Sequence, residues 1–155
     1  MSMNSDFFKR LLDICHSANQ VFAEKLFPAP DNPDEFIFKT FTHILMAENI
    51  WYRRILRKTI DRPFDRAYFN FEECNELISE NSEFLQEVLT TKKLNEEISY
   101  QRLSDGKSFT NSISDIFLHI SHHAAHHRGQ LARKLRERGI APPHSDFIVF
   151  CRKEN

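Results

Sequence analysis

Four long stretches of this chain repeat their apolar residues every three or four positions, which is typical of helices that bury one face. This spacing predicts helices over residues 6–27, 34–58, 71–91 and 112–138. Pro28 follows the first predicted helix and Gly139 follows the last, at positions where such residues end helices. Four amphipathic helices of similar length predict an all-α fold, a four-helix bundle.

A short β-hairpin is predicted between the third and fourth helices. Ile98, Tyr100 and Arg102 are expected to face Asn111, Phe109 and Lys107, respectively, across a Ser-Asp-Gly turn at 104–106. An isolated hairpin is only marginally stable, so we expect this one to pack on the helices. Residues 145–151 are expected to add one or two further helical turns.

Length and charge limit the class of protein. A chain of 155 residues fits one domain, so we treat 1–155 as a single unit. Its net charge of −1 provides no overall attraction to nucleic acid or to an anionic membrane, and we expect neither as a partner. The basic run from Arg128 to Arg138 is interpreted as a solvated helix face near the negative end of the helix dipole, in preference to a nucleic-acid contact.

The cysteines and the hydropathy favour a cytoplasmic protein. Cys15, Cys74 and Cys151 are odd in number and form no C-x-x-C pair, which argues against a disulfide framework or a thiolate zinc site. No window approaches the roughly 20 apolar residues that a membrane span needs. The N-terminal region also lacks the long apolar run of an export signal.

Five of the eight histidines lie within residues 119–127. Residues four apart on a helix are separated by about 40° and ~6 Å, so two histidines at that spacing can reach one ion. Three pairs have this spacing: 119/123, 122/126 and 123/127. His127 falls inside the apolar stripe and His123 on its edge, whereas His122 and His126 lie round towards the other side.

His123 and His127 are therefore the expected interior pair, with His119 next. A zinc-like ion in a catalytic site usually has a third protein ligand, and His43 is the best candidate because it lies in a mostly apolar helix. His16 and His144 are poorer candidates, since His16 is expected on the polar side of the first helix and His144 follows two prolines. Spacing alone also fits ordinary surface histidines or an incidental metal-binding tract.

Glu48 is the one carboxylate expected on a core-facing stripe, together with Phe41 and Ile44. A buried carboxylate needs a cation or hydrogen-bond donors, and Arg128 is the expected partner. Two interpretations remain open: a salt bridge that braces two helices, or a role beside the metal as a general base or positioning group. No catalytic residue is assigned, and Glu48 and Arg128 are the candidates.

These residues resemble the DinB/YfiT-like metalloprotein superfamily. The resemblance rests on His43 followed by Trp51 in the second helix and on an H-x-x-x-H-R-G-Q motif at 123–130. The Asp105-Gly106 turn and the closing segment 143–150 are also similar, so the resemblance covers essentially the whole chain. It implies a bundle with up-down-down-up topology, often a homodimer, and zinc or nickel bound at the positions of His43, His123 and His127.

The resemblance implies several activities. Some relatives are transferases that use low-molecular-weight thiols such as bacillithiol or mycothiol, and others are described as metal-dependent hydrolases. We therefore expect a metal-dependent, thiol-utilising transferase of stress or detoxification metabolism that acts on a small-molecule substrate. The alternatives are a hydrolase, or a non-catalytic stress- or DNA-damage-inducible protein in which the metal is structural or sensory.

Overall fold

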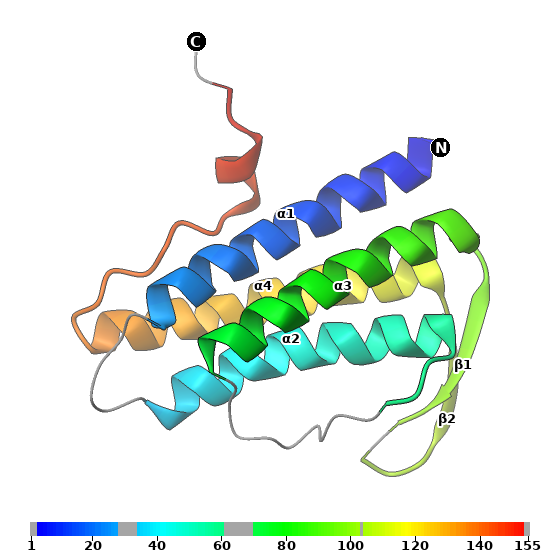
Figure 1. The fold of residues 1–155 in the computed structure, drawn as a ribbon, viewed down its shortest axis with the longest axis horizontal. Helices are drawn as coiled ribbons and strands as arrows, with labels where there is room; N and C mark the ends of the chain where they lie inside the picture. The colour runs from blue at the N-terminus through cyan, green and yellow to red at the C-terminus, as the bar shows by residue number, and fades with distance from the viewer. Residues whose placement is uncertain (1–2, 28–33, 61–69, 103, 154–155) are drawn as a thin grey trace.

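The computed structural model describes residues 3–27, 34–60, 70–102 and 104–153, which form four helices, one hairpin and a short C-terminal 3-10 helix (Figure 1). The elements are α1 (Met3–Leu26), α2 (Glu35–Leu56), α3 (Phe71–Thr91), β1 (Glu97–Gln101), β2 (Ser108–Ser112), α4 (Ile113–Glu137) and η1 (Phe147–Cys151). The predicted bundle and hairpin are thus confirmed, with helix ends displaced by at most a few residues. The sequence also predicts that Arg62-Pro63 closes the region of the second helix, but these two residues lie outside the described ranges.

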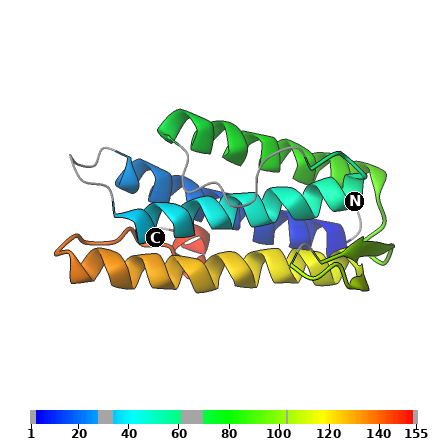
Figure 2. The same cartoon turned by 90° about the horizontal axis from the view of Figure 1, so that it is seen from below.

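The helices run in the up-down-down-up order. In Figure 1, α2 and α3 point the same way, whereas α1 and α4 point the opposite way. Helix α4 packs against α2 and against α1, and α3 packs against the same two helices. Figure 2 shows α2 between α3 and α4 in this arrangement. Helix α4 therefore has two packed faces, one towards α2 and one towards α1.

Side-chain caps set where three helices begin. Asp34 accepts a hydrogen bond from the Ile37 backbone N–H at the start of α2, as expected of a capping residue. Asn70 and Ser112 form capping boxes, with Glu73 at the start of α3 and with Asp115 at the start of α4. These polar side chains satisfy backbone donors that the first helical turn leaves unpaired.

The hairpin connects α3 to α4 in the predicted register. Ile98 pairs with Asn111 and Tyr100 with Phe109, in an antiparallel ladder. The Ile113 backbone N–H donates to Glu96, so the base of the hairpin is tied to the first turn of α4. Ile98 is buried against the helices, which supplies the packing that an isolated hairpin lacks.

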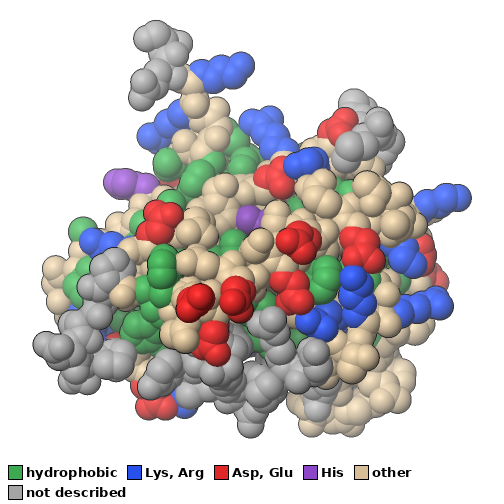
Figure 3. Space-filling model, in the orientation of Figure 1, with side chains coloured by type: hydrophobic (Ala, Val, Ile, Leu, Met, Phe, Trp, Pro, Cys, Tyr) green, Lys and Arg blue, Asp and Glu red, His purple; other side chains and the backbone are tan. Residues whose placement is uncertain are grey.

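The core lies along the predicted helix faces. The apolar stripe expected on α4 is buried throughout, and its members are Ile113, Ile116, Phe117, Ile120, Ala124, Leu131 and Leu135. The three cysteines are free thiols in the described structure, as their spacing predicted. Acidic and basic side chains share the outer face drawn in Figure 3, with acidic groups gathered over α3. None of the helices in the described ranges is long and apolar enough to cross a membrane.

Candidate metal centre

Three histidine side chains from two helices converge between α2 and α4. His43 comes from α2, and His123 and His127 come from successive turns of α4. Their ligand nitrogens all lie within 4.8 Å of one another. His43 Nε2 and His123 Nε2 are 3.0 Å apart. The structure thus brings together the three residues that the sequence singled out.

The helical period explains this convergence. His123 and His127 are four residues apart, and their ring centroids are separated by 4.5 Å. The buried stripe of α4 holds this edge of the helix against α2, so His43 faces both rings at centroid distances of 4.9 and 4.8 Å. His122 and His126 point to solvent, as the periodicity predicted.

All three converging histidines are half-buried, so one side of the cluster is open. His119, the next residue in line, is exposed and does not belong to the converging group. Its ring packs against Trp51 at 5.5 Å between centroids. Beyond Trp51, the Arg54 guanidinium lies 4.7 Å from the ring centroids of both Trp51 and Tyr100. These side chains continue the wall of the site towards the hairpin.

Gln130 has a role that the sequence analysis missed. Its Oε1 lies 2.9 Å from His127 Nδ1 and its Nε2 lies 3.0 Å from His126 Nε2. An amide oxygen only accepts hydrogen bonds, so His127 Nδ1 carries the proton and its Nε2 keeps a lone pair for a ligand. Carbonyl groups that orient histidines in this way are regular parts of metal sites. The i, i+3 spacing of 127 and 130 was the signal available in the sequence.

The electrostatics keep the rings of His43 and His123 uncharged near neutral pH. Burial, reinforced by the neighbouring His127 and His43, lowers the pKa of His123 to about 4. Burial and His127 also lower the pKa of His43. A metal ion binds the neutral form of imidazole, so these rings do not have to lose protons before they can coordinate at pH 7.

The cluster fits a divalent ion by its donor chemistry. Two imidazole nitrogens bound to one tetrahedral zinc at 2.0–2.1 Å are roughly 3.3 Å apart, close to the distance between His43 and His123. Imidazole donors suit both zinc and nickel. Three imidazoles with one open side match the donor count of catalytic sites, whereas structural zinc sites have four protein ligands. The residues present can therefore hold the metal that the resemblance implies.

The structure corrects two predictions about the polar core. His16 was expected on the polar side of its helix, but it is buried, with 7% of its surface exposed. Its Nε2 lies 2.5 Å from Glu48 Oε1, which also accepts a hydrogen bond from the Tyr52 hydroxyl. The expected Glu48–Arg128 ion pair was wrong, because His16 occupies that place. Hydrophobic periodicity cannot reveal a polar core residue whose partner lies on another helix.

Arg128 is the exception within the basic run. Arg133, Arg136 and Arg138 are exposed, in agreement with the expected solvated face. Arg128 is buried instead, and its Nη1 donates to Asn19 Oδ1 at 2.8 Å and to Cys15 Sγ at 3.5 Å. The candidates Glu48 and Arg128 thus belong to the interior between α1, α2 and α4, in contacts separate from the histidine cluster.

Comparisons with known proteins agree with this geometry. The model of the DinB family matches residues 22–154, a span that contains all three converging histidines and Gln130. A search of curated proteins finds no match for this chain. The family match covers most of the sequence, and this chain therefore belongs to the DinB family.

Proposed function

We propose that this protein is a metal-dependent enzyme that binds one zinc or nickel ion through His43, His123 and His127 and transfers a group to or from a low-molecular-weight thiol. The observation that carries the proposal is the three-histidine cluster, with all its ligand nitrogens within 4.8 Å and one side open. Three ligands and an accessible side favour catalysis over a purely structural role.

The side chains around the cluster support this assignment. Gln130 fixes the tautomer of His127, and burial keeps His43 and His123 unprotonated. When bound, the ion would supply a Lewis acid that lowers the pKa of a thiol or a water. Trp51 and His119 extend beside the cluster and offer an apolar and aromatic surface for a small substrate.

Metal content tests the first half of the proposal. Purified wild-type protein is expected to hold close to one equivalent of zinc or nickel, and His127→Ala is expected to lose it. His122→Ala is the matched control, because it removes an exposed histidine from the same helix. Equal metal content in all three proteins would refute the assigned ligands.

Turnover tests the second half. The protein is incubated with an electrophile and a panel of small thiols, with and without chelator. We expect conjugation with at least one thiol that disappears on chelation and in His127→Ala. Metal-dependent hydrolysis without thiol consumption would indicate a hydrolase, in which water and not a thiol uses the open side of the cluster. Full metal occupancy with neither activity would favour the alternative in which the metal is structural or sensory.

A further inference from the structure

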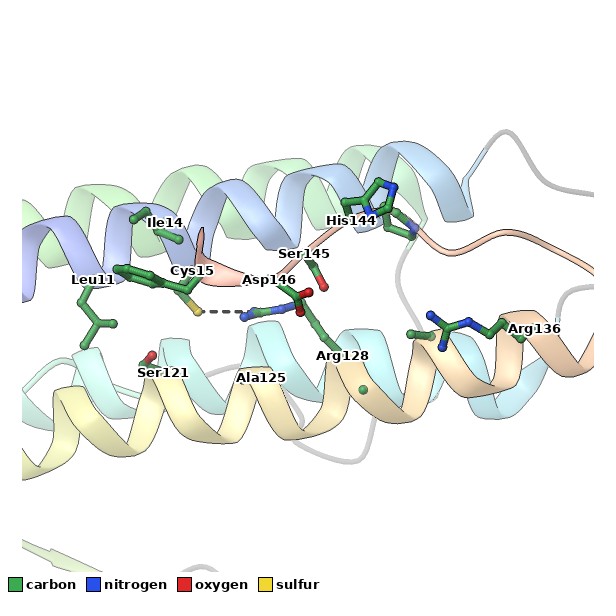
Figure 4. A pocket seen from close by; sticks show the side chains of 14 residues that line it. Leu11, Ile14, Cys15, Ser121, Ala125, Arg128, Arg136, His144, Ser145 and Asp146 are labelled. Atoms are coloured by element: carbon green, nitrogen blue, oxygen red, sulfur yellow. Dashed lines mark hydrogen bonds between the residues drawn. The ribbon is translucent and has the colours of Figure 1, made fainter. Parts of the chain in front are cut away.

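A cavity of about 390 Å³ lies on the side of α4 that faces α1, under the C-terminal segment that carries η1 (Figure 4). Its polar lining includes Arg128, Arg136, Ser121, Ser145 and Asp146. Leu11, Ile14 and Phe147 supply an apolar part. The volume falls within the range of small-molecule sites, and the lining suits a ligand with both an apolar and a polar part.

Arg128 is a buried cation held by neutral groups. Only 7% of its surface is exposed, and its hydrogen bonds go to Asn19 and Cys15. Burial raises the pKa of the Cys15 thiol to about 11, so this sulfur stays uncharged. A buried charge without an opposite charge is costly, because it loses its hydration without compensation.

Neither Glu48 nor Asp146 forms an ion pair with this cation in the described structure. Glu48 is engaged with His16, whose pKa is lowered by burial but raised overall by the charge and hydrogen bond of Glu48. Asp146 lines the same cavity, yet no ion pair joins it to Arg128 within the described ranges. The pair of His16 and Glu48 is thus balanced internally, and the positive charge of Arg128 remains.

One of the unpaired buried atoms belongs to a residue that lines the cavity. In the part of the chain that the structure describes, the buried side-chain atoms without a hydrogen-bond partner are His16 Nδ1, Asn19 Nδ2, Glu48 Oε2 and Arg128 Nε. Nη1 of Arg128 donates to Asn19 and Cys15, so Nη2 is the guanidinium nitrogen that is neither hydrogen-bonded in the described structure nor among these buried atoms. An N–H group of a guanidinium is a strong hydrogen-bond donor to a carboxylate oxygen.

Gly129 leaves backbone open to this cavity. It lies in the middle of α4, where glycine is unfavourable compared with alanine. A Cβ at this position would meet no heavy atom within 4 Å, so packing between helices does not require glycine here. Gly129 also lines the cavity, next to Arg128. Close approach of a ligand to the backbone is one reason for glycine at such a position.

We propose that this cavity is a second ligand site, which binds a small organic carboxylate with an oxygen on Nη2 of Arg128 and its apolar body against Leu11, Ile14 and Phe147. The site is separate from the histidine cluster and does not depend on metal.

The test uses 2-naphthoate as the probe, with full-length protein kept in chelator so that no metal can bind the carboxylate. Isothermal titration is expected to show saturable 1:1 binding with a Kd of about 1 mM or tighter, the affinity that modest ligand efficiency gives for a molecule of this size. Backbone amide shifts of Ser121, Gly129 and Ser145 are expected to move on binding, and that of His43 to stay in place.

Two comparisons make the test specific. Gly129→Leu fills the cavity and is expected to weaken binding at least about tenfold, whereas Gly129→Ala, which adds a single methyl group at the backbone, is expected to weaken binding by a smaller factor. The neutral 2-naphthamide is expected to bind at least about tenfold more weakly than 2-naphthoate, because it lacks the charge that pairs with Arg128.

Several results would overturn the proposal. These are no saturable binding to the wild-type protein, equal binding by Gly129→Leu, or equal affinity for the neutral amide. Binding that appears only in Asp146→Asn would also overturn it, since this chain's own Asp146 would then be the anion that Arg128 takes.

Discussion

The two packed faces of α4 carry opposite chemistry. Towards α2, the helix presents the imidazole nitrogens of His123 and His127, which are suited to a cation. Towards α1, it presents the buried guanidinium of Arg128, which is suited to an anion. His127 and Arg128 are adjacent in sequence, yet about 100° separates them around the helix axis. One short motif thus supplies two different environments, and neighbours in a motif need not share a site.

The histidine cluster and the polar interior formed by His16 and Glu48 also differ in burial, so substitutions in the two regions are expected to have different effects. The histidine cluster is half-exposed, so its members lose little packing when they are truncated. The interior pair of His16 and Glu48 is nearly inaccessible to solvent, with 7% and 3% exposed. Substitutions in the interior are therefore expected to change folding stability, and substitutions in the cluster are expected to change ion binding.

The largest effect is expected from His16→Ala. It leaves the Glu48 carboxylate buried without its partner, and losing one member of a buried ion pair lowers the free energy of unfolding by about 3–5 kcal/mol. Urea unfolding of the metal-free protein measures this loss. The exposed control His126→Ala should stay within about 0.5 kcal/mol of wild type. Equal free energies of unfolding for the two variants would contradict the prediction that interior substitutions destabilise the fold more than exposed ones.

The second effect concerns His123→Ala, which should barely change the stability of the metal-free protein. Zinc at about 100 times its Kd should stabilise the wild type by about 2.7 kcal/mol, since it binds only the folded state. That gain should vanish in His123→Ala and persist in His122→Ala, as measured by thermal unfolding with and without zinc. An unchanged zinc effect in His123→Ala would show that the ion binds elsewhere.

The third effect comes from the support that Gln130 gives to His127. Gln130→Leu removes the hydrogen bond to His127 Nδ1 and should weaken zinc binding by about 10- to 100-fold, the usual effect of losing a group that orients a metal ligand. Competition with a chromogenic chelator measures it. His126→Ala removes only the other contact of Gln130, so its zinc affinity should remain near that of wild type.

The smallest effect is a pair of opposite pH dependences in metal-free protein. The raised pKa of His16 contributes stability that is complete below about pH 6.5 and is lost as pH rises through its folded-state pKa. The destabilisation caused by His16→Gln should therefore shrink as pH rises. Urea unfolding of His16→Gln and wild type between about pH 5 and pH 8 measures this trend.

His123 should give the reverse trend. Its pKa is lowered to about 4, so the unfolded chain takes up its proton first, and stability is lost as pH falls from about 6.5 towards 4. His123→Ala should flatten that loss in the same urea series. Parallel pH profiles for the His16 and His123 variants would contradict the predicted difference between the polar interior around His16 and the histidine cluster.

Periodicity in the sequence predicted most of the fold and the position of the cluster. Apolar spacing placed the helices, and the turn of the helix distinguished His123 and His127 from His122 and His126. His43 could not be identified from the helical period alone, because it lies on another helix, 80 residues before His123. The argument succeeded there since a histidine in an apolar helix is itself unusual.

The interior polar network could not be predicted in this way. His16 and Asn19 share a buried face with Cys15, but a hydrophobic pattern counts polar residues as exposed. Which cation pairs with Glu48 depends on how far side chains of other helices extend across the bundle. The spacing of residues along one helix gives no information about this. For the same reason the sequence predicted the basic run correctly at Arg133, Arg136 and Arg138, and failed at Arg128.

The separation of His43 from His123 along the chain has a consequence for biosynthesis. Residue 43 emerges from the ribosome long before residues 123 and 127, and an N-terminal piece that ends before residue 123 contains only one of the three converging imidazoles. The nascent chain must therefore complete and dock its last long helix before it can hold an ion tightly. Metal binding would then occur only after tertiary folding is complete. A truncated translation product that lacks residues 123 and 127 would not bind the ion tightly.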